Sequence, residues 1–172
     1  MTTMMRASSL CVLAAILSAG GVPAQSAVPQ TGADSILLMT TLYRTAFANG
    51  LRTAHAMEKP ALVCVAGTAG DPLPAVVAAL ADSTTLLVRP KSACRVEPLQ
   101  SPSTGKSLVV DTLTGRRGIV ITVTDIAFDS SNGFTFHTTY YENGRSGAYW
   151  DCRGRRAGVK WEVVSCRMTG IS

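Results

Sequence analysis

The stretch GIVITVTDIAFDSSNGFTFHTTYY, residues 118–141, decides the fold of this chain. Residues 118–128 and 134–141 each alternate apolar and polar side chains, which is the period of a half-buried β-strand. Asn132-Gly133 between them is a strong hairpin signal. These residues therefore predict two long antiparallel strands in which Phe134 and Phe136 lie on the core face.

The apolar phase changes once within this stretch. Ile119, Ile121 and Val123 are in phase, whereas Ile126 and Phe128 are out of phase with them. A β-bulge near Thr124-Asp125 is the simplest repair, and it would curve the sheet.

Alternating patterns continue on both sides of this hairpin, with turn signals about every ten residues beyond Ser83. They predict antiparallel strands joined by hairpins. The further candidates are Leu86 to Arg89, Ala93 to Glu97, Leu108 to Thr112, Ala148 to Arg155 and Val159 to Arg167.

The residues before Ser83 follow a helical period instead. Apolar residues at steps of three and four predict a helix that is capped by Asp34 or Ser35 and ends before Pro60. Asn49-Gly50 is expected to bend or divide it. A buried strand over residues 61–65 and a short helix follow, and Asp71-Pro72 is the expected start of that helix.

Helices first and strands afterwards predict an α+β fold. The N-terminal helices are expected to pack on a curved, mainly antiparallel sheet, broadly like the cystatin or NTF2-like architectures. Residues 34–172 are predicted to form a single domain of this class, and residues 25–33 a loose N-terminal segment.

Residues 1–24 have the order of a secretory signal peptide: Arg6, an apolar stretch of about a dozen residues, and Val22-Pro23-Ala24. We expect cleavage, a periplasmic or secreted location and no membrane span, because roughly 20 apolar residues are needed to cross a bilayer. The formal net charge is +5, and it falls to about +4 without Arg6. This mild charge and the predicted export argue against a nucleic-acid partner.

The four cysteines that remain after cleavage are an even number, which suits an oxidising compartment. Cys152 and Cys166 flank one predicted hairpin and are expected to pair, which leaves Cys64 for Cys94. Because the chain contains no Cys-x-x-Cys pair, we predict disulfides and no metal site or cofactor.

One predicted hairpin concentrates positive charge near aromatic residues, which is typical of protein interfaces and of surfaces that hold acidic polymers. A solvated edge hairpin, whose arginines discourage pairing with other strands, explains the same charges. Lys160 and Arg167 belong to this cluster, with Asp151 and Glu162 as its acids. The candidate binding residues are Arg145, Tyr149, Arg153, Arg155 and Arg156.

A second hypothesis is a small-ligand or enzymatic pocket between sheet and helix. His137 would border it together with Tyr141 and Asp125, although a solvated strand face is the simpler explanation of His137 and Tyr141. The sequence holds no familiar enzyme signature, so no catalytic residue is predicted.

The last third of the chain resembles a loose group of uncharacterised exported bacterial proteins. The resemblance rests on Tyr140-Tyr141, Asn143-Gly144, Trp161-Glu162-Val163 and Ile171-Ser172, and it departs at Gly170, where that group has a second tryptophan. The group has no established activity, so the resemblance assigns no functional residue.

The sequence therefore favours an exported binding protein with a protein partner in the cell envelope, such as an inhibitor or immunity-type protein. A ligand pocket near His137 and a binder of acidic envelope polymers are the alternatives. The oligomeric state is left open.

Overall fold

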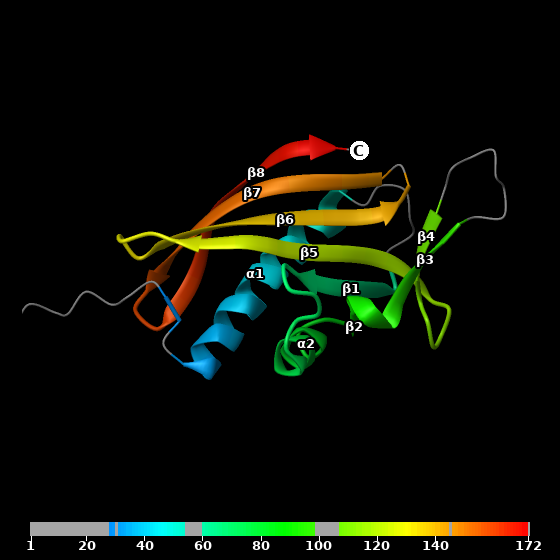
Figure 1. The fold of residues 1–172 in the computed structure, drawn as a ribbon, viewed down its shortest axis with the longest axis horizontal. Coiled ribbons are helices and arrows are strands. Elements are labelled where there is room, and N and C mark those ends of the chain that lie inside the picture. Colours follow the sequence, from blue (N-terminus) through cyan, green and yellow to red (C-terminus); the bar gives the residue numbers. More distant parts are fainter. Residues whose placement is uncertain (1–27, 30, 54–59, 99–106, 145, 172) are drawn as a thin grey trace, which may run out of the picture.

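A computed structural model of the chain describes residues 28–29, 31–53, 60–98, 107–144 and 146–171. This part of the chain forms an α+β fold with a mixed, mostly antiparallel open sheet (Figure 1). Neither of its helices is long and apolar enough to cross a membrane. The elements are α1 (Gly32–Thr53), β1 (Leu62–Gly67), α2 (Pro74–Ala81), β2 (Leu87–Pro90), the short 3-10 helix η1 (Lys91–Ala93), β3 (Cys94–Pro98), β4 (Ser107–Asp111), β5 (Arg117–Phe128), β6 (Gly133–Asn143), β7 (Ser146–Ala157) and β8 (Lys160–Ile171).

The strand order is β2-β1-β5-β6-β7-β8, with β3 and β4 attached to β5 off this path. β5 to β8 form the antiparallel meander that the alternating patterns predict. β1 lies between β2 and β5 and is parallel to both. The prediction that the strands after Ser83 are joined by hairpins is therefore wrong for β2, which follows α2 in a β-α-β crossover.

The predicted bulge is confirmed. The register between β5 and β6 shifts between Thr124 and Ala127, and Asp125 has a φ of 54°. The extra residue returns Ile126 and Phe128 to the face that carries Val123. β5 can therefore contribute apolar side chains to one core along its whole length.

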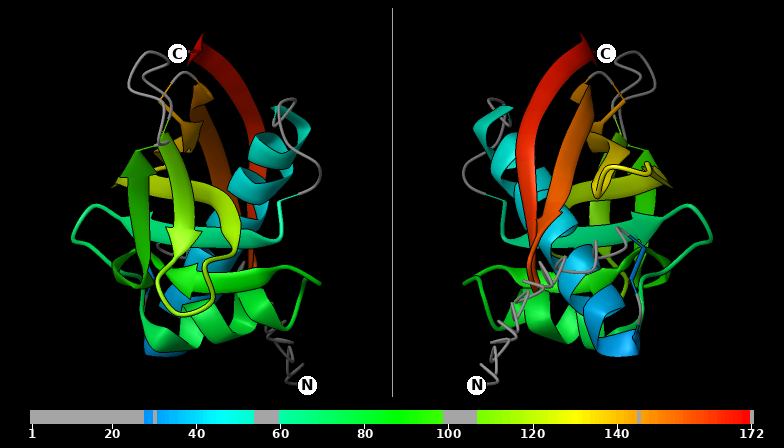
Figure 2. Two further views of the ribbon diagram at one scale, coloured as in Figure 1. Left: turned by 90° about the vertical axis from the view of Figure 1, so that its right-hand side faces the viewer. Right: turned by 90° about the vertical axis from the view of Figure 1, so that its left-hand side faces the viewer.

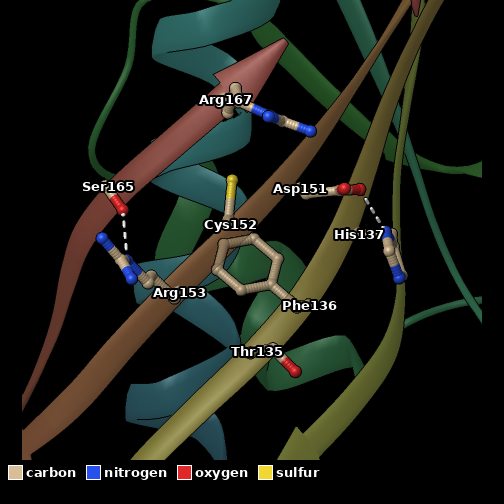
Figure 3. A pocket seen from close by; sticks show the side chains of 8 residues that line it. All are labelled: Thr135, Phe136, His137, Asp151, Cys152, Arg153, Ser165 and Arg167. Atoms are coloured by element: carbon tan, nitrogen blue, oxygen red, sulfur yellow. Dashed lines mark hydrogen bonds and ion pairs between the residues drawn. The ribbon is translucent and has the colours of Figure 1, made fainter. Parts of the chain in front are cut away.

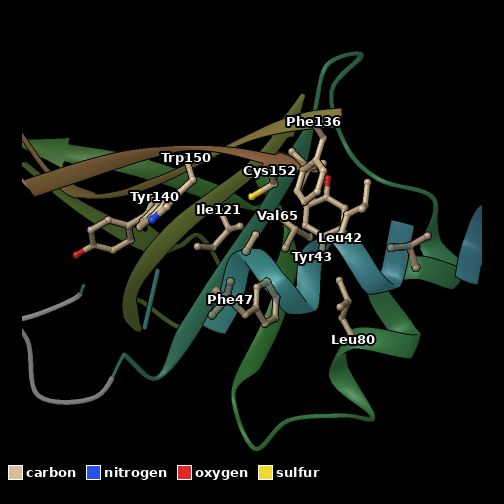
Figure 4. Packing of buried hydrophobic residues seen from close by; sticks show 14 of the residues in the cluster. Leu42, Tyr43, Phe47, Val65, Leu80, Ile121, Phe136, Tyr140, Trp150 and Cys152 are labelled. Carbon is tan, nitrogen blue, oxygen red and sulfur yellow. The ribbon is translucent and has the colours of Figure 1, made fainter. Parts of the chain in front are cut away.

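α1 packs its apolar side against this face of the sheet, where Tyr43 and Phe47 lie close to Phe136 and Ile121 (Figure 4). The helix continues through Asn49-Gly50 to Thr53, so the prediction that it divides there is wrong. A Cβ on Gly50 would lie 2.7 Å from Cδ1 of Ile121. Glycine at this position thus permits close approach of helix and sheet.

Both predicted helix caps are wrong. α1 begins at Gly32, because the Oγ1 of Thr31 accepts a hydrogen bond from the backbone N of Asp34 at 3.1 Å. α2 begins at Pro74 without a side-chain cap, and Asp71 Oδ1 instead accepts from the backbone N of Ser92 at 3.0 Å. The carboxylates of Asp34 and Asp71 instead contact residues distant in sequence, Arg156 and Ser92, which a local pattern does not reveal.

The other face of the sheet is covered at one end by the β3–β4 hairpin. A second, smaller core lies there, in which Leu62 and Val120 pack with Val109. The Cys64–Cys94 disulfide joins β1 to β3 within this core, and Cys152–Cys166 joins β7 to β8. Both predicted pairings are confirmed, and they fit an oxidising environment.

Removing either disulfide should lower the free energy of unfolding by about 3 kcal/mol, the usual scale for loops of this size. Cys64→Ala with Cys94→Ala should cost slightly more than Cys152→Ala with Cys166→Ala, because the first bridge closes the longer loop. Urea unfolding of the double variants measures both changes. Free thiols titrating in the native protein would contradict the pairings.

The positive φ at the bulge leads us to expect opposite changes in stability for two substitutions of Asp125. Asp125→Gly should raise the free energy of unfolding by about 1 kcal/mol, because glycine adopts positive φ without steric cost, whereas Asp125→Val should lower it by about as much or more. Ala127→Gly, at an exposed strand position beside the bulge, is the control and should be destabilising. Thermal unfolding of the three variants checks the signs.

Candidate functional site

The main candidate site is a groove of about 560 Å³ on β6, β7 and β8. Alternation along these strands places its charged side chains on the face opposite α1, and Figure 3 shows them in front of the strands with the helix behind. The lining residues are Thr135, Phe136, His137, Asp151, Cys152, Arg153, Ser165 and Arg167.

His137 and Asp151 form a hydrogen bond across β6 and β7. The register places these residues opposite each other, and Nδ1 of His137 lies 2.7 Å from Oδ1 of Asp151. Both side chains are about half exposed. The carboxylate orients the imidazole and leaves Nε2 of His137 for a ligand or for water.

Two arginines line the groove near Asp151: Arg153 follows it on β7, and Arg167 is on the neighbouring strand β8. Nε of Arg153 donates to Oγ of Ser165 at 2.9 Å, which fixes the side chain and leaves both terminal nitrogens for a ligand (Figure 3). Arg167 lies opposite Asp151 in the β7–β8 register. No described residue forms an ion pair or side-chain hydrogen bond with Arg167, so its donors are also available.

This arrangement favours binding of an anion. Asp151 is the one acidic residue in the lining, and it is already paired with His137. The guanidinium groups of Arg153 and Arg167 present planar donors that match carboxylate and phosphate oxygens. The groove is open and half-solvated, so it suits part of a larger ligand better than a fully enclosed small molecule.

The groove does not form a Ser-His-Asp triad. Ser165 is opposite Arg153 in the register and accepts its hydrogen bond, whereas His137 is on β6, with β7 between them. A nucleophile must lie within hydrogen-bond reach of its base. Among the described residues, no group of three or more His, Cys, Asp or Glu side chains is arranged to hold a metal ion.

The structure divides the predicted arginine cluster. Arg153 and Arg155 are on the exposed face of β7, and Arg155 forms a 3.4 Å ion pair with Glu162. Tyr149 shares that face and is 47% exposed. Its ring lies against Gly170, where a Cβ would be 3.3 Å from Cδ2 of the tyrosine. Arg145 lies outside the described residues.

Arg156 has a structural environment. Its guanidinium lies 4.9 Å from the centre of the Trp161 ring and 3.0 Å from Oδ2 of Asp34 at the start of α1. Nε1 of Trp161 donates to Oδ1 of the same aspartate at 2.7 Å. The side chains of Arg156 and Asp34 are only 12% and 10% exposed, so Arg156 joins the last hairpin to the helix rather than facing a partner.

The predicted pocket residues are not brought together. His137 lines the groove, but Tyr141 packs in the second core, and its hydroxyl lies 2.7 Å from Oγ of Ser107. Asp125 is in the bulge, where its backbone N donates to Oγ1 of Thr68 at 3.3 Å. Neither of these two residues lines the groove.

Of the two arginines that line the groove, Arg167 is the one that the predicted binding set omits. The expected Cys152–Cys166 pairing could have identified Arg167, because this pairing aligns Asp151 with Arg167 and Arg153 with Ser165 across the two strands.

Comparisons with protein families, with curated proteins and with solved structures found no match for this chain. Its function is therefore inferred from its own residues.

The two neighbouring arginines of β7 should respond differently to truncation. Arg156→Ala should lower the free energy of unfolding by about 2 kcal/mol, because it removes the poorly exposed ion pair with Asp34 and the cation–π contact with Trp161. Arg155→Ala is the matched control and should change it by less than about 1 kcal/mol, since its ion pair is exposed. Equal effects in urea unfolding would contradict the assignment.

Proposed function

We propose that this chain is an exported binding protein whose groove on β6–β8 receives an acidic segment of a protein partner in the cell envelope. An inhibitor or immunity-type protein would act in this way. The observation that carries the proposal is the pair of guanidinium groups with free donors, Arg153 and Arg167, on one exposed sheet face.

The chemistry of the surrounding face supports a protein partner. Tyr149 adds an exposed aromatic ring on the same strand face, and aromatic residues with arginine are enriched among the residues that dominate binding energy. The groove holds two available guanidinium groups and one acid already paired, which matches a short acidic segment. A long polyanion would require a more extended run of cations.

The strand face is a better docking surface than the strand edge. β8 is at one end of the strand order, and Figure 2 shows it curving along that edge. Val164 and Thr169 are extra residues in its register with β7, so each forms a bulge. Bulges on an edge strand interrupt the row of backbone groups that another strand would need for pairing.

The proposed location follows from the signal-peptide pattern of residues 1–24 together with the two disulfides. The expected analogy with cystatin and NTF2-like architectures belongs to the same proposal. In such an architecture the part of the second face that the β3–β4 hairpin does not cover, where the groove lies, would face the partner.

Arg153→Ala combined with Arg167→Ala should weaken partner binding by about tenfold or more, because each charge-assisted hydrogen bond contributes on the order of 1.5–3 kcal/mol. The test is a crosslinked pull-down from envelope extract, in which the full chain is expressed for export and bound proteins are identified by mass spectrometry. Arg116→Ala with Arg117→Ala, exposed and near the β4–β5 turn, is the control of equal charge.

Loss of one partner in the groove variant and its retention in the control would support the proposal. Equal retention by both variants would remove the groove as the interface. Binding that fades steeply between low and high salt, without any single protein retained, would instead indicate an acidic envelope polymer.

A further inference from the structure

A second cavity, of about 290 Å³, lies on the helix side of the sheet. It is bounded by α1, by the loop between β1 and α2, by the start of α2 and by β5 near its bulge. Its lining residues are Met39, Tyr43, Gly67, Thr68, Ala69, Gly70, Asp71, Pro72, Leu73, Val76, Val123 and Ile126.

The bulge and the loop build this cavity. The extra residue at Asp125 places Ile126 on the helix side, so its side chain forms part of the wall. The loop is closed on itself, because Gly67 and Gly70 exchange backbone hydrogen bonds of 2.6 and 3.2 Å. Thr68 ties the loop to the bulge through the backbone N of Asp125. The loop that forms this part of the cavity wall is therefore fixed both by its own hydrogen bonds and by its hydrogen bond to β5.

Two side chains of the lining, Tyr43 and Asp71, offer acceptor oxygens. The hydroxyl of Tyr43, a lining residue, donates a hydrogen bond to the carbonyl O of Ala66 at 2.6 Å, so toward a ligand its oxygen can act only as an acceptor. Burial, and then the charge of Asp71, raises the pKa of Tyr43, so the hydroxyl stays neutral. Hydrogen bonds from Ser92 lower the pKa of Asp71, which keeps that carboxylate ionised.

Asp71 is the one charged side chain among the described residues that line this cavity, and the charge of Lys91, which is outside the lining, also acts on its carboxylate. The rest of the lining is mostly apolar, from Met39 on α1 to Val76 on α2 and Val123 on β5. A ligand that fits must bring an apolar body and a cationic donor. This is opposite to the chemistry of the groove on the other face.

We propose that this cavity binds a small primary amine, with its ammonium group at Asp71 and Tyr43 and its apolar body against Met39, Val123 and Ile126. A cavity of roughly 150 Å³ lined by apolar side chains can hold benzene. One of about 290 Å³ accommodates an amine with a single ring or a short aliphatic chain.

Benzylamine, benzyl alcohol and benzoate are suitable probes, because they share a ring and differ in charge. Benzylamine should bind with a Kd about tenfold lower than that of benzyl alcohol, the scale of one charge-assisted hydrogen bond, and benzoate should bind more weakly than either. Isothermal titration with the purified chain measures the three constants.

Two variants separate charge from shape. Asp71→Asn should reduce the preference for benzylamine over benzyl alcohol to less than about twofold, while Asp82→Asn, an exposed acid after α2 and outside the lining, should leave it unchanged. Ala69→Phe adds a ring to an exposed lining residue and should weaken both ligands about tenfold.

Thermal unfolding verifies that each variant is folded. If Asp71→Asn does not fold, the Ala69→Phe variant together with the order of the three ligands still decides the proposal. Equal binding of benzylamine and benzoate to the folded chain, or binding that Ala69→Phe leaves unchanged, would overturn it.

Discussion

The structure depends on the burial of one face of the β5–β8 meander under α1. Side chains alternate along each strand, so a helix on one side fixes the orientation of every residue in four strands at once. Phe134, Phe136 and Tyr140 are buried on β6, while His137 between them is exposed. The opposite face differs between its two ends. The β3–β4 hairpin covers one end of it, and charged side chains keep the other end in water.

Much of this arrangement could be predicted because its signals are local. Alternation in residues 118–141 indicated both strands, and the change of phase at Ile126 indicated the bulge. The Cys152–Cys166 pairing followed from a single hairpin. The errors have a common physical origin. Asp34 and Asp71 look like helix caps, yet distant residues use them, and the parallel insertion of β1 between β2 and β5 is a tertiary pairing that periodicity does not encode.

The candidate site was only partly predictable for the same reason. Composition showed that the last hairpin is rich in arginine, but neighbours in sequence have different environments on a strand. Arg155 faces water, whereas the guanidinium of Arg156 is packed on Trp161 and paired with Asp34. A charge cluster counted along the chain therefore overestimates the binding surface. Cross-strand register is the better guide, because it determines which arginines share a face with the exposed ring of Tyr149.

The bulge in β5 borders both sites that we propose. Thr124 is paired with His137 of the groove, and Ile126, two residues later, is part of the wall of the cavity on the helix side. The two sites have opposite electrostatic character, with Arg153 and Arg167 on one face and Asp71 on the other. A purely anionic ligand suited to the groove would therefore be repelled from the cavity. Because Asp125 holds positive φ, the conformation of this single residue sets the face on which Ile126 lies, directly after the Thr124–His137 pair that borders the groove.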